Sequence, residues 1–247
     1  MTWERGRVFD ADVGEMFRRM VSDAKNARVE DFTEKEERRP RPGGLNTVEM
    51  LKAASAGLGM GAHHAMQIAE RLYIQGYISY PRTESTGYPA GFDLKGTLRA
   101  QRRHPVWGSY VSELLDGGAM ARPRAGKDEG DHPPITPMEA VTESHVGGGD
   151  AWRLYDFIAR HFIASVSPDC TYAAQKATLS LGGEKLQVTG QSVLTHGWTT
   201  IMPHRAIEEN PLPEMNEGES LPVAHVDLRQ GKTSPPPYLS ESELIGL

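Results

Sequence analysis

A nucleophile, a cation and several hydroxyls are crowded into nine residues of this chain, Tyr77 to Ser85. Pro81 disfavours the helical region for the residue before it, so we expect Tyr80 in an extended segment. Arg82 then lies two residues away, on the same side of an extended chain. A guanidinium favours the phenolate form of a nearby tyrosine and offers two parallel donors to phosphate oxygens. Tyr80 and Arg82 together therefore have the chemistry needed to attack a phosphodiester.

The same residue types also have a purely structural interpretation. A tyrosine in a short strand is commonly half-buried packing, and a nearby arginine is commonly a solvated surface charge. Spacing alone does not choose among Tyr73, Tyr77, Tyr80 and Tyr88, although Tyr73 falls on the apolar face of a predicted helix.

A second polar cluster occupies residues 128–137, where His132 is followed by two prolines. The prolines hold the backbone extended and leave the imidazole on a stiff segment. A surface or capping role is one interpretation of this histidine. A metal site is another, and its ligands would be Asp128, Glu129, Asp131 and His132, although consecutive prolines restrict wrapping around an ion.

Length and composition allow one large or two modest domains, with 247 residues that include 26 Gly and 17 Pro. Cys170 is the only cysteine, which excludes an internal disulfide and fits a reducing compartment. No apolar run approaches about 18 residues, and the start lacks an apolar signal region. The sequence therefore predicts neither a membrane span nor secretion.

The net charge of −6 disfavours binding to nucleic acid, but the charges are segregated along the chain. Residues 95–127 hold seven basic side chains against two acidic ones, whereas residues 128–247 hold seven against seventeen. Phosphate-backbone binding depends on such local clusters, because each neutralised phosphate releases a counterion. A solvated loop surface is the alternative. The side chains predicted to contact nucleic acid are Lys95, Arg99, Arg102, Arg103, Arg122, Arg124 and Lys127.

Apolar periodicity predicts an α+β fold in which helices come first and a β hairpin follows. Asn46 and Glu49 are typical of a helix start, and Gly182-Gly183 is typical of a hairpin turn. A helix, a glycine break, a second helix and a short strand resemble a helix-turn-helix. The predicted helices lie at 10–25, 46–58, 65–73, within 93–120, at 152–166 and from 240 onward. The predicted strands lie at 26–32, 177–181, 186–188, 190–202 and 221–228. An exposed connector is predicted at 34–44 and a Pro-rich linker at 233–237.

Two stretches in the right order, Leu45–Pro89 and Asp128–Pro137, resemble the active-site region of type IA DNA topoisomerases. Within that family the resemblance is strongest to the eukaryotic III beta subgroup, and it extends with few gaps from Trp3 to Leu247. It implies a helical, helix-turn-helix-like (winged-helix or CAP-like) domain inserted into a β-rich arch domain. The domains expected on this basis are 1–44 and 151–236 for the two segments of the arch, 45–150 for the inserted domain and 237–247 for the start of a following domain, with hinges at 38–44 and 145–150.

The resemblance also implies a reaction. In the family, the tyrosine of the Tyr-x-Arg-Thr element attacks DNA to form a 5′-phosphotyrosine without ATP, and Tyr80 holds that position here. A histidine lies close to the scissile phosphate in the family, and His132 occupies its place. Arg82 would bind the phosphate, and Thr83 and Ser85 would hold the adjacent backbone.

The cofactor and partners are likewise implied by the resemblance. The family's Mg²⁺ is bound by an N-terminal module that does not precede Met1, so we expect no metal within this chain and no activity from it alone. The expected partners are single-stranded DNA, RNA and a Tudor-domain protein, in a soluble nuclear or cytoplasmic protein. The alternative function is a non-catalytic module that binds nucleic acid or protein through the basic loop and the arch.

Overall fold

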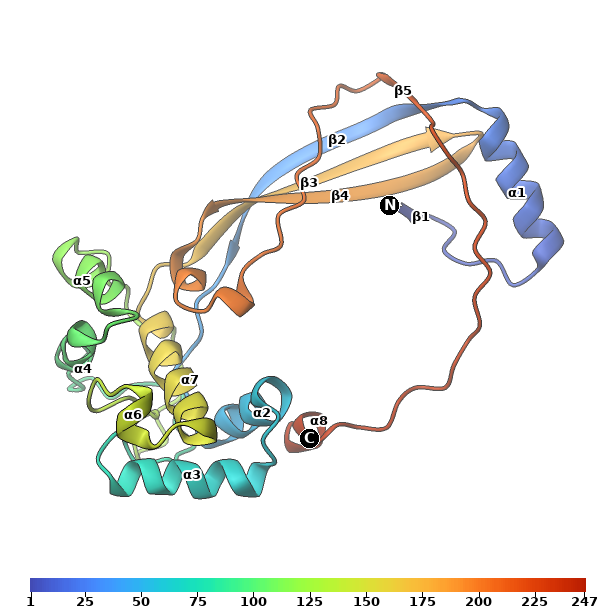
Figure 1. Cartoon of the computed structure of the whole chain (residues 1–247). Coiled ribbons are helices and arrows are strands. Elements are labelled where there is room, and N and C mark those ends of the chain that lie inside the picture. Colours follow the sequence, from blue (N-terminus) through green and yellow to red (C-terminus); the bar gives the residue numbers. More distant parts are fainter. The chain divides into compact units, whose positions relative to one another are not determined.

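The computed structural model describes all 247 residues, which form two compact units (Figure 1). The sheet unit comprises residues 1–38, 171–195 and 207–236, and the helical unit comprises residues 39–170, 196–206 and 237–247. The main part of the helical unit is thus inserted between two segments of the sheet unit. We expected divisions at residues 44 and 150, whereas the chain passes between the units after residues 38 and 170.

The sheet unit is built on one five-stranded sheet, in the order β1-β4-β3-β2-β5. Its turn between β3 and β4 is the two-residue Gly182-Gly183 loop, in which both residues have positive φ, 58° and 82°. Two positive φ values match the twist of the flanking strands, which is why Asn and Gly dominate such turns. The predicted hairpin is therefore confirmed. The strands are β1 (Thr2–Trp3), β2 (Asn26–Arg39), β3 (Cys170–Leu181), β4 (Glu184–Thr195) and β5 (Ser220–Pro222).

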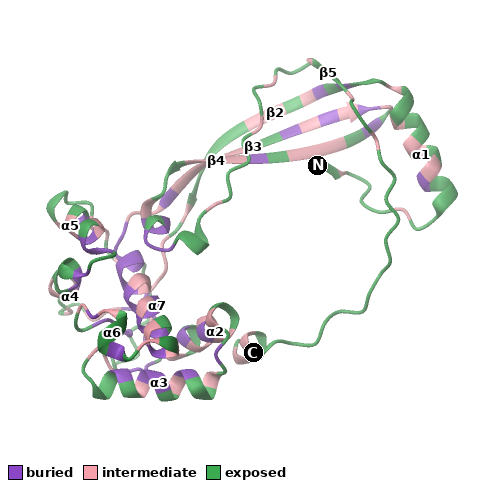
Figure 2. Ribbon diagram, viewed as in Figure 1, coloured by how far each residue is buried: buried purple, intermediate pink, exposed green.

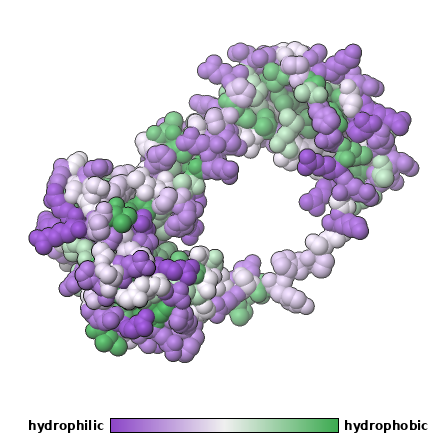
Figure 3. Space-filling model, in the orientation of Figure 1, coloured by the Kyte–Doolittle hydropathy of each residue, from purple (hydrophilic) through white to green (hydrophobic).

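The predicted first helix is α1 (Ala11–Asp23), which begins at Asp10 because that side chain accepts hydrogen bonds from the Asp12 and Val13 amides at 2.9 and 3.0 Å. The α1 backbone lies directly on the hairpin turn, since a Cβ on Gly182 would stand 2.5 Å from the Met20 carbonyl oxygen. Apolar residues gather over the strands of this unit (Figure 3). The buried core residues of the sheet unit are Ala27, Val29, Ala177, Leu179 and Leu181.

The helical unit packs around α7 (Gly149–Ser165), whose inner positions are buried along its whole length (Figure 2). Around it lie α2 (Thr47–Leu58), α3 (Ala62–Ile74), α4 (Leu94–Ala100), α5 (Gly108–Asp116), α6 (Glu143–Val146) and α8 (Glu241–Ile245). The fully buried side chains of this unit include Leu45, Met50, Leu72, Leu98, Trp107, Leu154, Tyr155, Ile158, Phe162 and Ile163. None of the helices in the chain is both long and apolar enough to cross a bilayer.

The start of α2 follows the predicted signal, since the Asn46 side chain accepts a hydrogen bond from the Glu49 amide at 2.9 Å. The helix ends at Gly59, whose φ of +64° is the left-handed conformation that glycine adopts at little cost. The segment 77–85 follows α3 in the chain, and the Thr47 hydroxyl at the start of α2 donates to the Pro81 carbonyl at 2.8 Å, so both helices position this segment.

Three expectations about strands are wrong. The exposed connector expected at 34–44 is largely strand, because β2 runs to Arg39 and its charged side chains pair across the sheet: Glu34 with Gln175 at 2.7 Å and Glu37 with Tyr172 at 2.6 Å. Strand β4 stops at Thr195 and gives way to a 3-10 helix, and β5 covers only Ser220–Pro222. Tertiary pairing overrides the local charge pattern in the first case.

Candidate active site

The segment that carries Tyr80 is held extended by backbone pairing to residues 136–138. Gly76 reverses the chain after α3 with a φ of +79°. The Tyr77 carbonyl then accepts from the Met138 amide and the Ser79 amide donates to the Thr136 carbonyl, both at 2.9 Å, with an antiparallel bridge between Ile78 and Pro137. Ile78 is buried, so the alternation of an extended chain leaves its neighbours Tyr77 and Ser79 half-buried.

The phenol ring of Tyr80 is half-buried and lies between two other rings. The imidazole of His132 is tilted against it with ring centroids 4.5 Å apart, and Tyr73 meets it edge-on at 5.2 Å. The structure thus brings together two residues that are 52 positions apart in the sequence. His132 itself is exposed, so its imidazole can be reached by a ligand.

Arg82 is exposed and forms an ion pair with Glu70 of α3. Its Nε donates to Glu70 Oε1 at 3.0 Å, and one terminal nitrogen donates to the same oxygen. The hydrogen bond and the charge of Glu70 raise the pKa of Arg82 above its usual value, and the Tyr80 phenolate adds to this rise.

Thr83 and Ser85 lie in the interior and not on a surface that nucleic acid can reach. Their side chains are 3% and 0% exposed. The Thr83 hydroxyl donates to the His132 carbonyl at 2.7 Å, and the Ser85 hydroxyl donates to Asp131 at 2.9 Å and accepts from the Glu129 amide at 3.0 Å. Both residues therefore hold the loop at 128–132 in place. The prediction that they contact a nucleic acid backbone is wrong, because they are buried.

Asp131 completes this support of the loop. Its carboxylate accepts hydrogen bonds from the His132 amide, from Ser85 and from the Glu84 amide, and these lower the pKa of Asp131 to about 2. A carboxylate that accepts several hydrogen bonds stays ionised, since each bond favours the charged form. The loop that presents His132 to Tyr80 is thus tied to the segment that directly follows Arg82, through Glu84 and Ser85.

The seven basic residues predicted to contact nucleic acid are all exposed. Lys95 and Arg99 lie on α4, Arg102 and Arg103 on the 3-10 helix that follows it, and Arg122, Arg124 and Lys127 on the loop before His132. Two of them are partly neutralised, Arg102 by Asp116 and Lys127 by Glu129. The structure ties Lys127 to the site, because its carbonyl accepts from the Thr86 and Gly87 amides at 2.9 Å.

The residues of this chain do not fit a metal ion. No group of three or more His, Cys, Asp or Glu side chains converges. Of the ligands considered at the loop, Asp128 bonds the Gly130 amide, Glu129 pairs with Lys127, and Asp131 is occupied by its own hydrogen bonds. The metal interpretation of residues 128–132 is therefore wrong.

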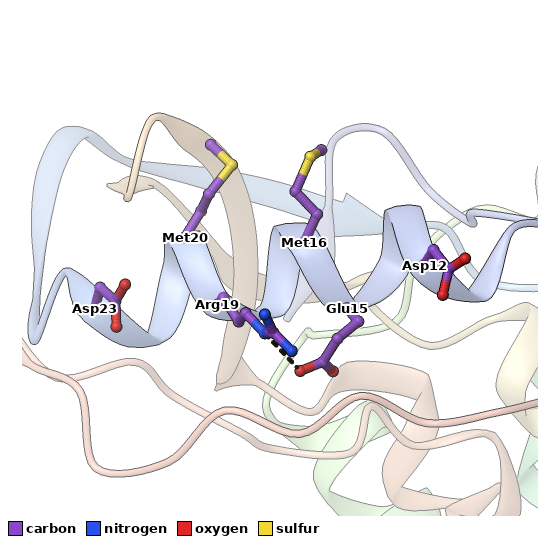
Figure 4. A pocket seen from close by; sticks show the side chains of 6 residues that line it. All are labelled: Asp12, Glu15, Met16, Arg19, Met20 and Asp23. Carbon is purple, nitrogen blue, oxygen red and sulfur yellow. Dashed lines mark hydrogen bonds and ion pairs between the residues drawn. The ribbon is translucent and has the colours of Figure 1, made fainter.

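A shallow hollow on α1 is also unrelated to this chemistry. It is lined by six residues of that one helix, Asp12, Glu15, Met16, Arg19, Met20 and Asp23 (Figure 4). The Arg18 and Arg19 side chains both bind Glu15, which lowers the pKa of Glu15 to about 2. The hollow is an open space between side chains of a surface helix and holds none of the site residues.

Two residues that contact the site are not identified by the sequence analysis, Glu70 beside Arg82 and Tyr73 beside Tyr80. Glu70 was not singled out, and Tyr73 was placed on the apolar face of its helix, whereas its side chain is 44% exposed and touches Tyr80. The sequence signal that could have identified both is their spacing of three residues on α3. Residues at i and i+3 share one helical face, and α3 ends only a few residues before Tyr80.

Comparisons with known proteins agree with this arrangement. A family profile described as DNA topoisomerase matches residues 1–247. The fold is similar to that of full-length topoisomerase I from Thermotoga maritima, with a TM-score of 0.76 and 20% sequence identity over 98% of this chain and 40% of that one. The chain therefore belongs to the type IA DNA topoisomerase family.

Two relatives indicate a subgroup within this family. DNA topoisomerase 3-beta of Arabidopsis thaliana is 53% identical over 247 residues, and human DNA topoisomerase 3-beta-1 is 52% identical over 248 residues. Each alignment covers 100% of this chain and 28% of the relative, so the chain spans little more than a quarter of their length. The resemblance to the III beta subgroup and the α+β fold inferred from the sequence are thereby confirmed.

Proposed function

We propose that the protein containing this chain cleaves and rejoins one nucleic acid strand through a covalent bond to Tyr80. The observation that carries the proposal is the contact between the Tyr80 and His132 rings at 4.5 Å, next to an arginine, in a chain of the topoisomerase family. Residue spacing alone leaves the identity of the nucleophile open, and this contact supports the choice of Tyr80 over Tyr77 and Tyr88.

In the proposed step the Tyr80 oxygen attacks a backbone phosphorus. The bond from phosphorus to the 3′ oxygen breaks, the 3′ oxygen takes up a proton, and the phenolic proton leaves to solvent. The product is a 5′-phosphotyrosine, which keeps a phosphodiester bond, so the free 3′ hydroxyl can reverse the step without ATP. Passage of another strand through the break before it is rejoined would change the topology of the nucleic acid.

The side chains of the site would lower the barrier in two ways. A free tyrosine with a pKa near 10 is only about one-thousandth ionised at pH 7, so the attack needs help from neighbouring groups. Arg82 offers paired donors to the phosphate oxygens, where negative charge grows during attack. In the proposal, His132 donates a hydrogen bond to the same phosphate or orients it.

The proposal is tested by Tyr80→Phe, with Tyr77→Phe as its matched control. Both variants are made in the full-length gene product and mixed with an end-labelled single-stranded oligonucleotide. We expect Tyr80→Phe to lose all covalent adduct while binding the oligonucleotide as the wild type does, and Tyr77→Phe to keep both properties. An undiminished adduct in Tyr80→Phe refutes the assignment.

The alternative is a non-catalytic module that binds nucleic acid or protein through its basic residues, and it predicts binding without adduct even for the wild type. RNA as a second substrate, a Tudor-domain partner and a nuclear location are further proposals that follow from the family resemblance of the sequence; the names of the 3-beta relatives specify none of them. An RNA oligonucleotide of the same sequence in the adduct assay tests the first of these.

A further inference from the structure

The ion pair between Arg82 and Glu70 leaves part of the guanidinium free. Arginine carries five N–H donors on two edges that can each bind an oxyanion. Glu70 takes the edge formed by Nε and one terminal nitrogen, and both of these hydrogen bonds end on a single oxygen, Oε1. The other terminal nitrogen of Arg82 has no partner in the chain, so the end of the guanidinium remains available to a phosphate.

Helix α3 delivers two side chains to the segment at 77–85. Glu70 and Tyr73 are three residues apart and lie on one face of the helix. Tyr73 contacts the ring of Tyr80 and Glu70 binds Arg82, so one helical face restrains both the nucleophile and its neighbouring cation. The backbone turn at Gly76 makes this possible, because it sends the chain back along α3.

Stability is a poor explanation for this pair. Its side chains are 57% and 41% exposed, and exposed ion pairs contribute between zero and about 1 kcal/mol. A long arginine side chain on a surface otherwise samples many rotamers, and ordering it at the moment of reaction costs free energy. A fixed partner on a helix removes that cost beforehand.

We propose that Glu70 is a positioning residue for the reaction at Tyr80: it holds Arg82 by one edge and turns the other edge toward the scissile phosphate. This inference rests on the proposed function. The alternative role for Glu70 is competition, in which the phosphate displaces the carboxylate and takes its place on Arg82. Under competition, removing the Glu70 carboxylate tightens binding of the oligonucleotide, whereas under positioning it does not.

The test compares Glu70→Ala and Glu70→Gln in the full-length gene product, in single-turnover cleavage of a saturating single-stranded oligonucleotide. We expect Glu70→Ala to slow adduct formation by roughly 10-fold, because a loosely held catalytic group loses its orientation. Glu70→Gln should stay within about 3-fold of the wild type, because the amide oxygen can accept both of the hydrogen bonds that now end on Oε1.

Controls separate this role from a general effect of charge. Glu49→Gln removes the same charge from another exposed ion pair of the helical unit, that with Lys52, and provides the baseline for binding. On an Arg82→Ala background, Glu70→Ala should cause no further loss of rate, because its effect passes through Arg82.

Three results would overturn the inference: a wild-type rate in Glu70→Ala, a Glu70→Gln as slow as Glu70→Ala, or binding in both variants that is several-fold tighter than in Glu49→Gln. The last result would instead establish competition. Each of these presupposes that the wild type forms an adduct. A wild type without adduct would instead contradict the proposed function itself.

Discussion

The hydroxyl of Thr83 provides a quantitative test of how the site is held together. This buried group donates to the His132 carbonyl at 2.7 Å and accepts from the Ser85 amide at 3.1 Å. Thr83→Val keeps the shape of the side chain but leaves that carbonyl and that amide without their partner. An unsatisfied buried polar group costs about 1–3 kcal/mol, so we expect the free energy of unfolding to fall by about that amount.

Thr136 offers a control of the same residue type and burial. Its side chain is 0% exposed, but its hydroxyl has no hydrogen-bond partner. The folded state already bears the cost of burying that hydroxyl, so Thr136→Val should leave the stability unchanged or raise it by up to about 1 kcal/mol. The same substitution is thus predicted to lower the stability at Thr83 and not to lower it at Thr136.

Urea unfolding followed by tryptophan fluorescence measures both effects. Three of the four tryptophans, Trp107, Trp152 and Trp198, belong to the helical unit, so the signal mainly reports on it. With a denaturant slope of about 2 kcal/mol per molar urea, a loss of about 1–3 kcal/mol lowers the midpoint by roughly 0.5–1.5 M. Equal shifts in the two variants, or no shift in Thr83→Val, would refute the assignment of Thr83 as the support of the His132 loop.

Two further predictions concern the sheet unit and the helical unit separately. Gly182→Ala should destabilise the hairpin by at least about 2 kcal/mol, because the residue has a positive φ and its new Cβ would lie 2.5 Å from the Met20 carbonyl oxygen. At Gly183 a new Cβ meets nothing within 4 Å, so Gly183→Ala should cost only about 1 kcal/mol. Thermal unfolding of the two variants measures both effects. Burial lowers the pKa of His161 to about 4, so below about pH 6.5 the unfolded state binds more protons than the folded state. The contribution of the neutral, buried His161 to stability is therefore fully present above about pH 6.5 and is lost as the pH falls toward 4. His161→Gln, which can still donate to the Gly43 carbonyl, should reduce the difference between urea midpoints measured at pH 7 and pH 4.5; an unchanged difference would contradict this origin.

Features with a local cause were predictable from the sequence. The start of α2 depends on Asn46 and an amide three residues away, and the β3–β4 turn depends on two adjacent glycines. The extended backbone at Tyr80 was likewise expected from Pro81. In each case the interacting groups are neighbours in the chain, so residue order alone carries the information.

Features with a distant partner were not predictable in this way. The charged end of β2 is a strand because Glu34 and Glu37 bind side chains more than 130 residues away. Thr83 and Ser85 look like exposed hydroxyls beside a reactive tyrosine, but the loop that buries them begins more than 40 residues later. Only the folded chain shows that they support His132.

The central claim is that Tyr80, and no other tyrosine, becomes linked to nucleic acid. Cleavage after Arg71 and Arg82 yields one peptide, residues 72–82, which contains Tyr73, Tyr77 and Tyr80. The adduct is trapped, its nucleic acid is digested to a remnant, and the peptide is fragmented in a mass spectrometer. Our account predicts that every fragment carrying the added phosphate includes Tyr80; a phosphate on Tyr77, on Tyr73 or on any other peptide would contradict it.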